Sequence, residues 1–216
     1  MKAALEDVSR AHDLHQSEGG IRLSIAESPP ATNGRYLIDA KGSTFTVRAF
    51  ATGMLSAFGH SPTIAIPDFQ GEVQFSSSTL EDASLRLVIQ AASSTVTDDI
   101  SNKDRREMER QMHDDVLEVD SYPEIIYECP RISSVQQISE GSYLVSMDGE
   151  LTLRGVTRSQ PVAAKVTLKG DVLRATGDVS ILQSDYEIRP VSAVGGTIKL
   201  KDELKLSFII SARKQA

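Results

Sequence analysis

Histidine and serine side chains are the groups in this chain that could perform acid–base and nucleophilic chemistry. His60 and His113 are the candidate general bases within the predicted β region, and Ser61 and Ser184 are the nucleophiles by default. A catalytic serine needs a base within hydrogen-bond reach and a third group that orients this base. No spacing in the chain pairs these residues with an orienting carboxylate. Turn chemistry is therefore the simpler interpretation of each, and we predict that the protein is not an enzyme.

Metal and thiol chemistry is also weakly supported. His12 and His15 lie three residues apart in a segment with helical spacing, which is a spacing that metal ligands use. No carboxylate or cysteine is placed to complete a site, so a solvated helix face is expected. Cys129 is the single cysteine, which excludes an intrachain disulfide and favours a small buried apolar residue. We predict no metal and no catalytic cofactor.

Composition limits the classes of partner and the compartment. The chain of 216 residues is 40% hydrophobic and 5% aromatic with no Trp, so its interior must be mostly aliphatic. A net charge of −7 without a basic stripe argues against nucleic acid as a partner. The sequence contains no secretory signal and no apolar run long enough to span a membrane, so we expect a cytoplasmic protein that is not integral to the membrane. A periplasmic location stays open if the N-terminus is truncated.

Alternating hydrophobicity is the dominant pattern of the chain. In residues 143–157, every second position is apolar while charged and hydroxyl side chains fill the alternate set, which predicts one long antiparallel strand with a dry and a wet face. The same alternation recurs through Tyr36, Ile38 and Ala40; Phe45, Val47 and Ala49; Val73 and Phe75; Leu85, Leu87 and Ile89; Ile125 and Tyr127; and Leu204, Leu206 and Phe208. Roughly eight or more such strands would expose their edges, and closure into a barrel removes these edges.

Two segments depart from the β pattern. Residues 1–33 are predicted to be an N-terminal extension with a short helix and strand, and residues 34–216 the barrel domain. The alternation also stops for about thirty residues after Ala91, which a compact domain tolerates when the segment has structure of its own. Ser101 is a suitable N-cap there, and Met108, Met112 and Val116 form one apolar helix face. We expect an amphipathic helix that lies on an apolar surface.

Several short motifs resemble the YceI-like family. They are Tyr36-Leu37-Ile38-Asp39, Phe58-Gly59-His60, Gly71, Tyr122-Pro123-Glu124-Ile125, the run from Gly149 through Leu151-Thr152-Leu153-Arg154-Gly155-Val156-Thr157, and Gln183-Ser184-Asp185-Tyr186-Glu187-Ile188. They occur in the family's order over roughly residues 35–212. The resemblance implies an all-β fold, an extended lipocalin-like barrel of eight antiparallel strands with one amphipathic helix near the mouth. It also implies an elongated hydrophobic cavity that takes a polyisoprenoid or another long-chain amphiphile.

The functional hypothesis is therefore non-catalytic binding, and carriage or storage, of a polyisoprenoid, an isoprenoid quinone or a fatty-acid-like lipid. The residues expected to contact this lipid-like small molecule are Phe45, Val47, Phe58, Val73, Phe75, Leu85, Leu87, Ile89, Met108, Met112, Ile125, Tyr127, Tyr143, Val145, Met147, Leu151, Leu153, Leu204, Leu206 and Phe208. Parity alone does not say whether inward residues leave a cavity or fill it. A protein-interaction barrel with a filled core, a lipid-modifying enzyme and a homodimer stay open as alternatives.

Overall fold

The structure is a computed structural model that describes residues 34–52, 61–75, 80–190, 192–193 and 198–215. The predicted N-terminal extension, with His12 and His15, lies outside the described residues. Phe58 and His60 lie outside them as well.

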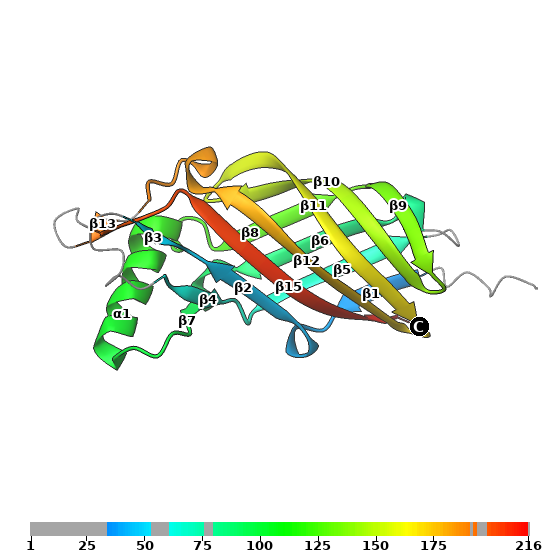
Figure 1. Ribbon diagram of the computed structural model, residues 1–216, viewed down its shortest axis with the longest axis horizontal. Coiled ribbons are helices and arrows are strands. Elements are labelled where there is room, and N and C mark those ends of the chain that lie inside the picture. The colour runs from blue at the N-terminus through cyan, green and yellow to red at the C-terminus, as the bar shows by residue number, and fades with distance from the viewer. Residues whose placement is uncertain (1–33, 53–60, 76–79, 191, 194–197, 216) are drawn as a thin grey trace, which may run out of the picture.

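A closed antiparallel barrel forms the body of the protein (Figure 1). Eight of the described strands make up the closed wall, in the order β1-β5-β6-β8-β10-β11-β12-β15, and the pairing of β1 with β15 completes it. Their bounds are Gly34–Ile38, Phe69–Phe75, Ser84–Gln90, Glu124–Cys129, Ser142–Leu153, Val156–Lys169, Val172–Leu182 and Glu203–Lys214. The predicted all-β barrel is thereby confirmed.

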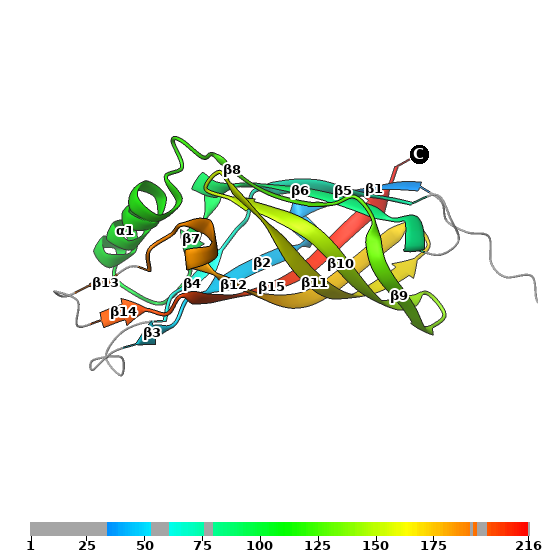
Figure 2. The same ribbon diagram turned by 90° about the horizontal axis from the view of Figure 1, so that it is seen from above.

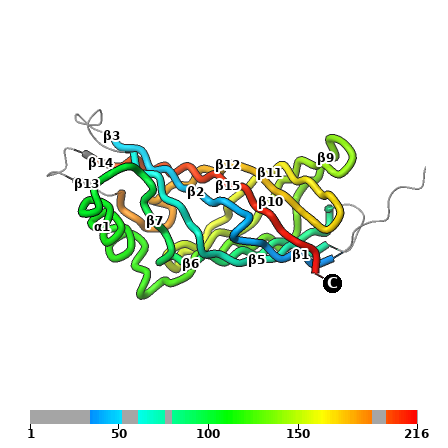
Figure 3. Tube along the Cα trace, turned by 90° about the horizontal axis from the view of Figure 1, so that it is seen from below, coloured from blue at the N-terminus to red at the C-terminus, as the bar shows by residue number. Residues whose placement is uncertain are grey.

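β15 is longer than either β1 or β2 (Thr44–Arg48), so on one edge it pairs with both of them at different positions along its length. β1 pairs with the last residues of β15, while β2 pairs with its first half. From β2 the sheet continues through β4 (Thr63–Ala65) to β7 (Thr95–Val96). β7 and the helix α1 lie at the same end of the barrel, which we call the mouth (Figure 3). At the other end, the base, β9 (Ile132–Ser139) pairs with β10.

Short elements complete the described chain. The 3₁₀ turns η1, η2, η3 and η5 span Ala40–Gly42, Leu80–Asp82, Ala91–Ser93 and Gln183–Tyr186. A separate three-stranded sheet at the mouth contains β3 (Ala51–Thr52), β14 (Ile198–Leu200) and β13 (Ser192–Ala193). It lies beside α1 in Figure 2.

The predicted helix is present and begins where its N-cap was expected. α1 spans Asn102–Gln111, and the Ser101 hydroxyl accepts a hydrogen bond from the Asp104 N–H at 3.1 Å. A π-helical turn, η4 (Met112–Leu117), continues α1 and ends at Glu118 in the left-handed region, with a φ of 48°. Within the described ranges, no helix is long and apolar enough to cross a membrane.

The prediction of one long strand over residues 143–157 is wrong in one respect, because a turn divides this segment into two strands. β10 ends at Leu153, and Arg154 and Gly155 form a two-residue turn with φ values of 51° and 71° before β11 begins at Val156. Two consecutive positive φ values match the right-handed twist of a hairpin. The turn residues keep the alternation in phase, so the period alone did not reveal the reversal.

Residues 198–214 also alternate in hydrophobicity, and they form two strands, β14 and β15. They are separated at Lys201 and Asp202. The Asp202 carboxylate accepts hydrogen bonds from the backbone N–H of Ser184, at 2.8 Å, and from its hydroxyl. Ser184 is therefore the polar partner of this acidic residue.

Candidate ligand-binding cavity

A cavity of about 510 Å³ runs inside the barrel and is walled by side chains from nearly every strand and from α1. This volume lies in the usual range for a site that takes one small organic ligand. Residues from the predicted set that line the cavity are Phe45, Val47, Val73, Leu85, Leu87, Ile89, Met108, Met112, Ile125, Tyr127, Val145, Met147, Leu151, Leu153, Leu204, Leu206 and Phe208. The alternation of the strands, together with the methionine face of the helical segment, thus places these side chains around one space.

Two predicted residues have the expected inward parity but do not line the cavity. Phe75 is buried at the base, where its ring stacks on Tyr36 with 5.3 Å between centroids. Tyr143 is half-buried and packs against the core beside the wall. Neither side chain is among those that line the cavity, because each packs against other core residues instead.

Other wall residues were missed in the sequence. On β11 and β12 they are Val162, Ala164, Val166, Leu173, Ala175, Val179 and Ile181. Alternation in residues 162–168 contained this signal, since Ala163, Lys165 and Thr167 on the opposite parity are exposed. The small side chains Ala164 and Ala175 leave space that larger residues would occupy.

The cavity wall is apolar and carries few polar groups. Its polar side chains are Ser84, Ser94, Gln111, Gln160 and Gln183, apart from the hydroxyl of Tyr127. No Asp, Glu, Lys, Arg or His of the described chain lines it. Gln183 is 3% exposed and donates from Nε2 to the Lys201 carbonyl at 2.9 Å, so it also fixes the chain at the mouth. An uncharged wall of this kind favours apolar ligands, because removing an unpaired charge of a ligand from water is costly.

Tyr127 illustrates how the wall satisfies a buried polar group. Its hydroxyl donates to the backbone carbonyl of Gln160 at 3.2 Å. Burial is the main cause that raises the pKa of Tyr127, so the phenol stays protonated at neutral pH. Its ring lies against Gly149, where an added Cβ would come 2.5 Å from the ring. The aromatic ring is therefore held at the wall by its partner glycine.

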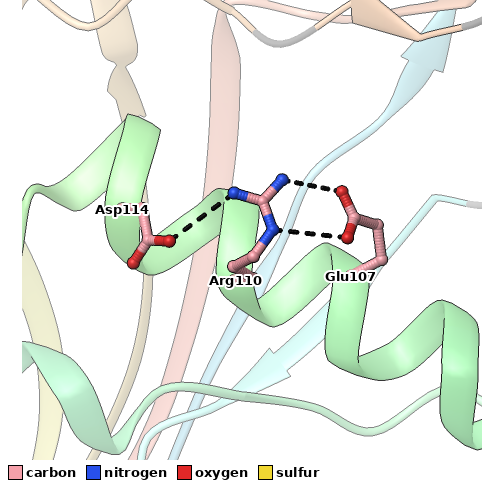
Figure 4. Close-up of polar contacts among 3 residues, drawn as sticks. All are labelled: Glu107, Arg110 and Asp114. Atoms are coloured by element: carbon pink, nitrogen blue, oxygen red, sulfur yellow. Dashed lines mark hydrogen bonds and ion pairs between the residues drawn. The ribbon is translucent and has the colours of Figure 1, made fainter.

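Helix α1 closes one side of the mouth and presents different faces inward and outward. Met108 and Met112 line the cavity. On the outer face, Arg110 bridges Glu107 and Asp114, with N···O distances of 2.7 and 3.5 Å (Figure 4). The Arg110 guanidinium lowers the pKa of Glu107 by hydrogen bonding. These exposed ion pairs contribute little energy, but they keep the charged face in water and the methionine face toward the cavity.

Side chains of α1 also form hydrogen bonds with the edge of β7, where a neighbouring strand would otherwise pair. β7 ends the sheet path, so its outer edge has no neighbouring strand among the described residues. The carboxylate of Glu109 accepts from the Val96 N–H at 2.9 Å, and the Arg105 guanidinium donates to the Val96 carbonyl and, at 2.9 Å, to the Asp98 carbonyl. Side chains of the helix therefore satisfy the edge that a strand would otherwise pair with.

The end of the helical segment is tied to two other elements of the mouth. Glu118 forms an ion pair with Arg154 of the β10–β11 turn. Arg154 also donates to the Glu187 carbonyl at 3.1 Å. One arginine thus joins the helical segment, a hairpin turn and the chain that follows η5.

Candidate catalytic groups do not converge in the described part of the chain. A ring nitrogen of His113 lies 2.9 Å from the Ser94 carbonyl. The Ser61 hydroxyl accepts from the Ala51 N–H at 3.2 Å, and that of Ser184 donates to Asp202. Neither described serine contacts a described histidine, and these residues contain no cluster of His, Cys, Asp or Glu that could hold a metal ion.

Comparison with known families gives one match, which covers most of the chain. A model of the YceI-like domain matches residues 36–212. The search of curated proteins found no match.

Solved structures share the fold at low sequence identity. BcnA from Burkholderia cenocepacia is 17% identical with a TM-score of 0.59, over 81% of this chain and 98% of BcnA. A polyisoprenoid-binding domain from Saccharophagus degradans, implicated in plant cell wall breakdown, is 14% identical with a TM-score of 0.60, over 85% and 99%. The YCEI protein of Campylobacter jejuni is 16% identical with a TM-score of 0.51, over 71% and 85%. At these identities the likeness establishes the barrel fold.

Proposed function

The chain belongs to the YceI-like family, and we propose that it binds a long-chain amphiphile in its barrel and carries or stores it without chemical change. The ligand classes that fit are a polyisoprenoid, an isoprenoid quinone and a fatty-acid-like lipid. The Saccharophagus degradans neighbour, a polyisoprenoid-binding domain, is consistent with this proposal.

The observation that carries the proposal is the cavity of about 510 Å³ with its uncharged, aliphatic wall. Removing hydrocarbon from water contributes about 0.8 kcal/mol per carbon, so one isoprene unit of five carbons contributes about 4 kcal/mol. Part of this gain is offset by the loss of ligand freedom on binding. A chain of a few such units would still bind strongly, whereas a polar metabolite of the same volume would lose its hydrogen bonds to water.

The orientation of the ligand follows from the distribution of charge. The wall is apolar along its length, while charged groups such as Arg154 and Glu118 lie at the mouth. We infer that a charged or strongly hydrated head group lies at the mouth and the hydrocarbon chain inside the barrel. Ser61, Ser184 and His113 use their polar atoms in structural hydrogen bonds, which supports binding rather than catalysis.

Direct detection of the ligand tests this function. Protein purified without detergent should carry a bound mass in native mass spectrometry, and organic extraction should release a long-chain amphiphile. A protein that was stripped of lipid should then bind a lipophilic fluorophore, and a polyisoprenoid alcohol should displace it. If stripped protein binds neither the fluorophore nor any long-chain lipid, the carrier function is wrong.

A further inference from the structure

Strand β9 is an edge strand at the base of the barrel. It pairs with β10 on one side. On its other side, the backbone contact found within the described chain is the Ile132 N–H, which donates to the Ala83 carbonyl at 2.9 Å. The turn η2 also contacts β9, but within the described residues no strand pairs with this edge beyond Ile132. An unpaired edge of this length is a template for another strand.

The composition of β9 does not protect this edge. Natural edge strands usually discourage pairing with charged side chains, proline or a covering element. A quarter of the whole chain is charged, yet the eight residues Ile132–Ser139 contain neither a charged residue nor a proline. The strand therefore combines a backbone edge that no described strand pairs with and side chains that permit close approach.

Exposed apolar side chains lie on the same hairpin. Ile138 is 52% exposed and Leu144 is 47% exposed, and they are two of the four large hydrophobic residues exposed in the described chain. Leu144 on β10 is in register with Gln136 on β9, so it lies one strand away from the free edge. A partner strand on that edge would bring apolar surface next to both residues.

We propose that a second copy of this chain occupies the edge, with the β9 strands of the two copies paired antiparallel about a two-fold axis. Antiparallel pairing of a strand with itself is self-complementary, as a two-fold interface requires. β9 is preceded by Arg131 and followed by Glu140, both exposed. Reversing one strand against the other brings Arg131 of each copy to the end where Glu140 of the other copy lies. Opposite charges thus meet at both ends of an uncharged centre.

The position of β9 makes this dimer compatible with an open mouth. β9 and α1 lie at opposite ends of the barrel in two perpendicular views (Figures 1 and 2). Pairing at the base leaves the helix and the cavity mouth of each copy uncovered. The dimer joins two separate cavities and does not depend on what these cavities hold.

Sedimentation velocity of the full chain over a range of protein concentrations tests the interface. In the register that opposes Arg131 to Glu140, Ser134 of one copy lies opposite Gln137 of the other, and both positions are exposed. Wild-type protein should reach a dimer, whereas the double variant Ser134→Lys, Gln137→Lys should shift toward the monomer. Like charges opposed across an antiparallel pair are destabilising, so the dimer dissociation constant should rise about tenfold or more. Thr176→Lys, at an exposed position of the interior strand β12, is the matched control and should leave the dimer unchanged.

Hydrogen exchange of the wild-type protein gives a second test that needs no variant. Among residues 133–139, the backbone amides that point away from β10 should become more protected as the dimer forms with rising concentration. The proposal is overturned if the wild-type chain stays monomeric, or if a dimer forms equally well in the double lysine variant. It is also overturned if these amides are already fully protected in the monomer, because residues of the same chain would then cover the edge.

Discussion

Substituting Met147 with Trp should abolish ligand binding while leaving the barrel folded. Met147 lies on β10, is 7% exposed and lines the cavity. Its register partners on the neighbouring strands are Ile132 and Val162, which also line the cavity. A larger side chain at this position can extend into the cavity rather than into packed neighbours.

The expected loss of affinity follows from the volume that the new ring takes. Trp has about six more non-hydrogen atoms than Met, which is roughly the size of one isoprene unit. Displacing about five carbons at about 0.8 kcal/mol each removes about 4 kcal/mol of binding energy, or roughly a thousandfold in Kd. The free energy of unfolding should fall by less than about 1 kcal/mol, whereas overpacking a filled core costs about 1–3 kcal/mol.

Titration of the stripped protein with a lipophilic fluorophore measures the change in Kd, and urea denaturation measures the change in the free energy of unfolding. Ser146→Trp is the matched control, because Ser146 is the next residue on the same strand and its side chain is exposed on the outer face. This control should bind as the wild type does. The reasoning would be refuted if Met147→Trp kept full affinity, or if it lost 1–3 kcal/mol of stability, which is typical of an overpacked core.

Three further predictions concern the wall, the helix and the thiol. Gly177→Ala should destabilise the fold by about 1–3 kcal/mol in urea denaturation, because the new Cβ would lie 2.5 Å from the Ala163 carbonyl and 2.6 Å from the Phe208 ring. Arg105→Gln should speed ligand transfer to lipid vesicles about tenfold, since charged hydrogen bonds to the Val96 and Asp98 carbonyls are lost. Cys129 should react with a thiol reagent after unfolding and resist it in the native state, because it is 1% exposed and burial raises the pKa of its thiol.

Matched controls separate these effects from general damage. Gly34→Ala should be tolerated, because its added methyl group meets the flexible side chain of Lys214. Arg106→Gln changes an exposed arginine next to Arg105 and should leave the transfer rate unaltered. Equal transfer rates in both arginine variants would contradict the role of the Arg105 hydrogen bonds. A Gly177→Ala protein as stable as the wild type would contradict the close contact at Gly177, and rapid labelling of native Cys129 would contradict its burial.

The sequence predicted the faces of the strands better than their ends. Inward parity is visible because slipping a strand by one residue would bury groups such as Glu150 or Lys205, which are exposed in the structure. The end of β10 was missed because Arg154 and Gly155 preserve the alternation across a reversal of the chain. The N-cap at Ser101 was predictable because capping depends on neighbouring residues alone.

Features that depend on distant contacts were beyond the sequence pattern. Asp202 interrupts an apolar parity, but the alternation does not reveal that Ser184 is its hydrogen-bond partner. Glu109 and Arg105 resemble ordinary surface charges of a helix until β7 lies beside them. Gln160 shares the inward parity of Val162 and Ala164, but its polar side chain resembles that of an outward residue, so the hydrophobic pattern does not reveal it.

Glycine and aromatic residues together help to explain why this barrel holds a cavity rather than a filled core. Eight strands enclose a space that side chains can just fill or that one ligand can occupy, so residue size at the inner positions decides the outcome. Gly177 is in register with Phe208, and Gly149 lies against the Tyr127 ring. The rings of Phe208 and Tyr127 occupy the positions where a Cβ atom of Gly177 or Gly149 would lie, so both rings lie along the wall. The space that a ring would fill at the centre of the barrel then remains for hydrocarbon.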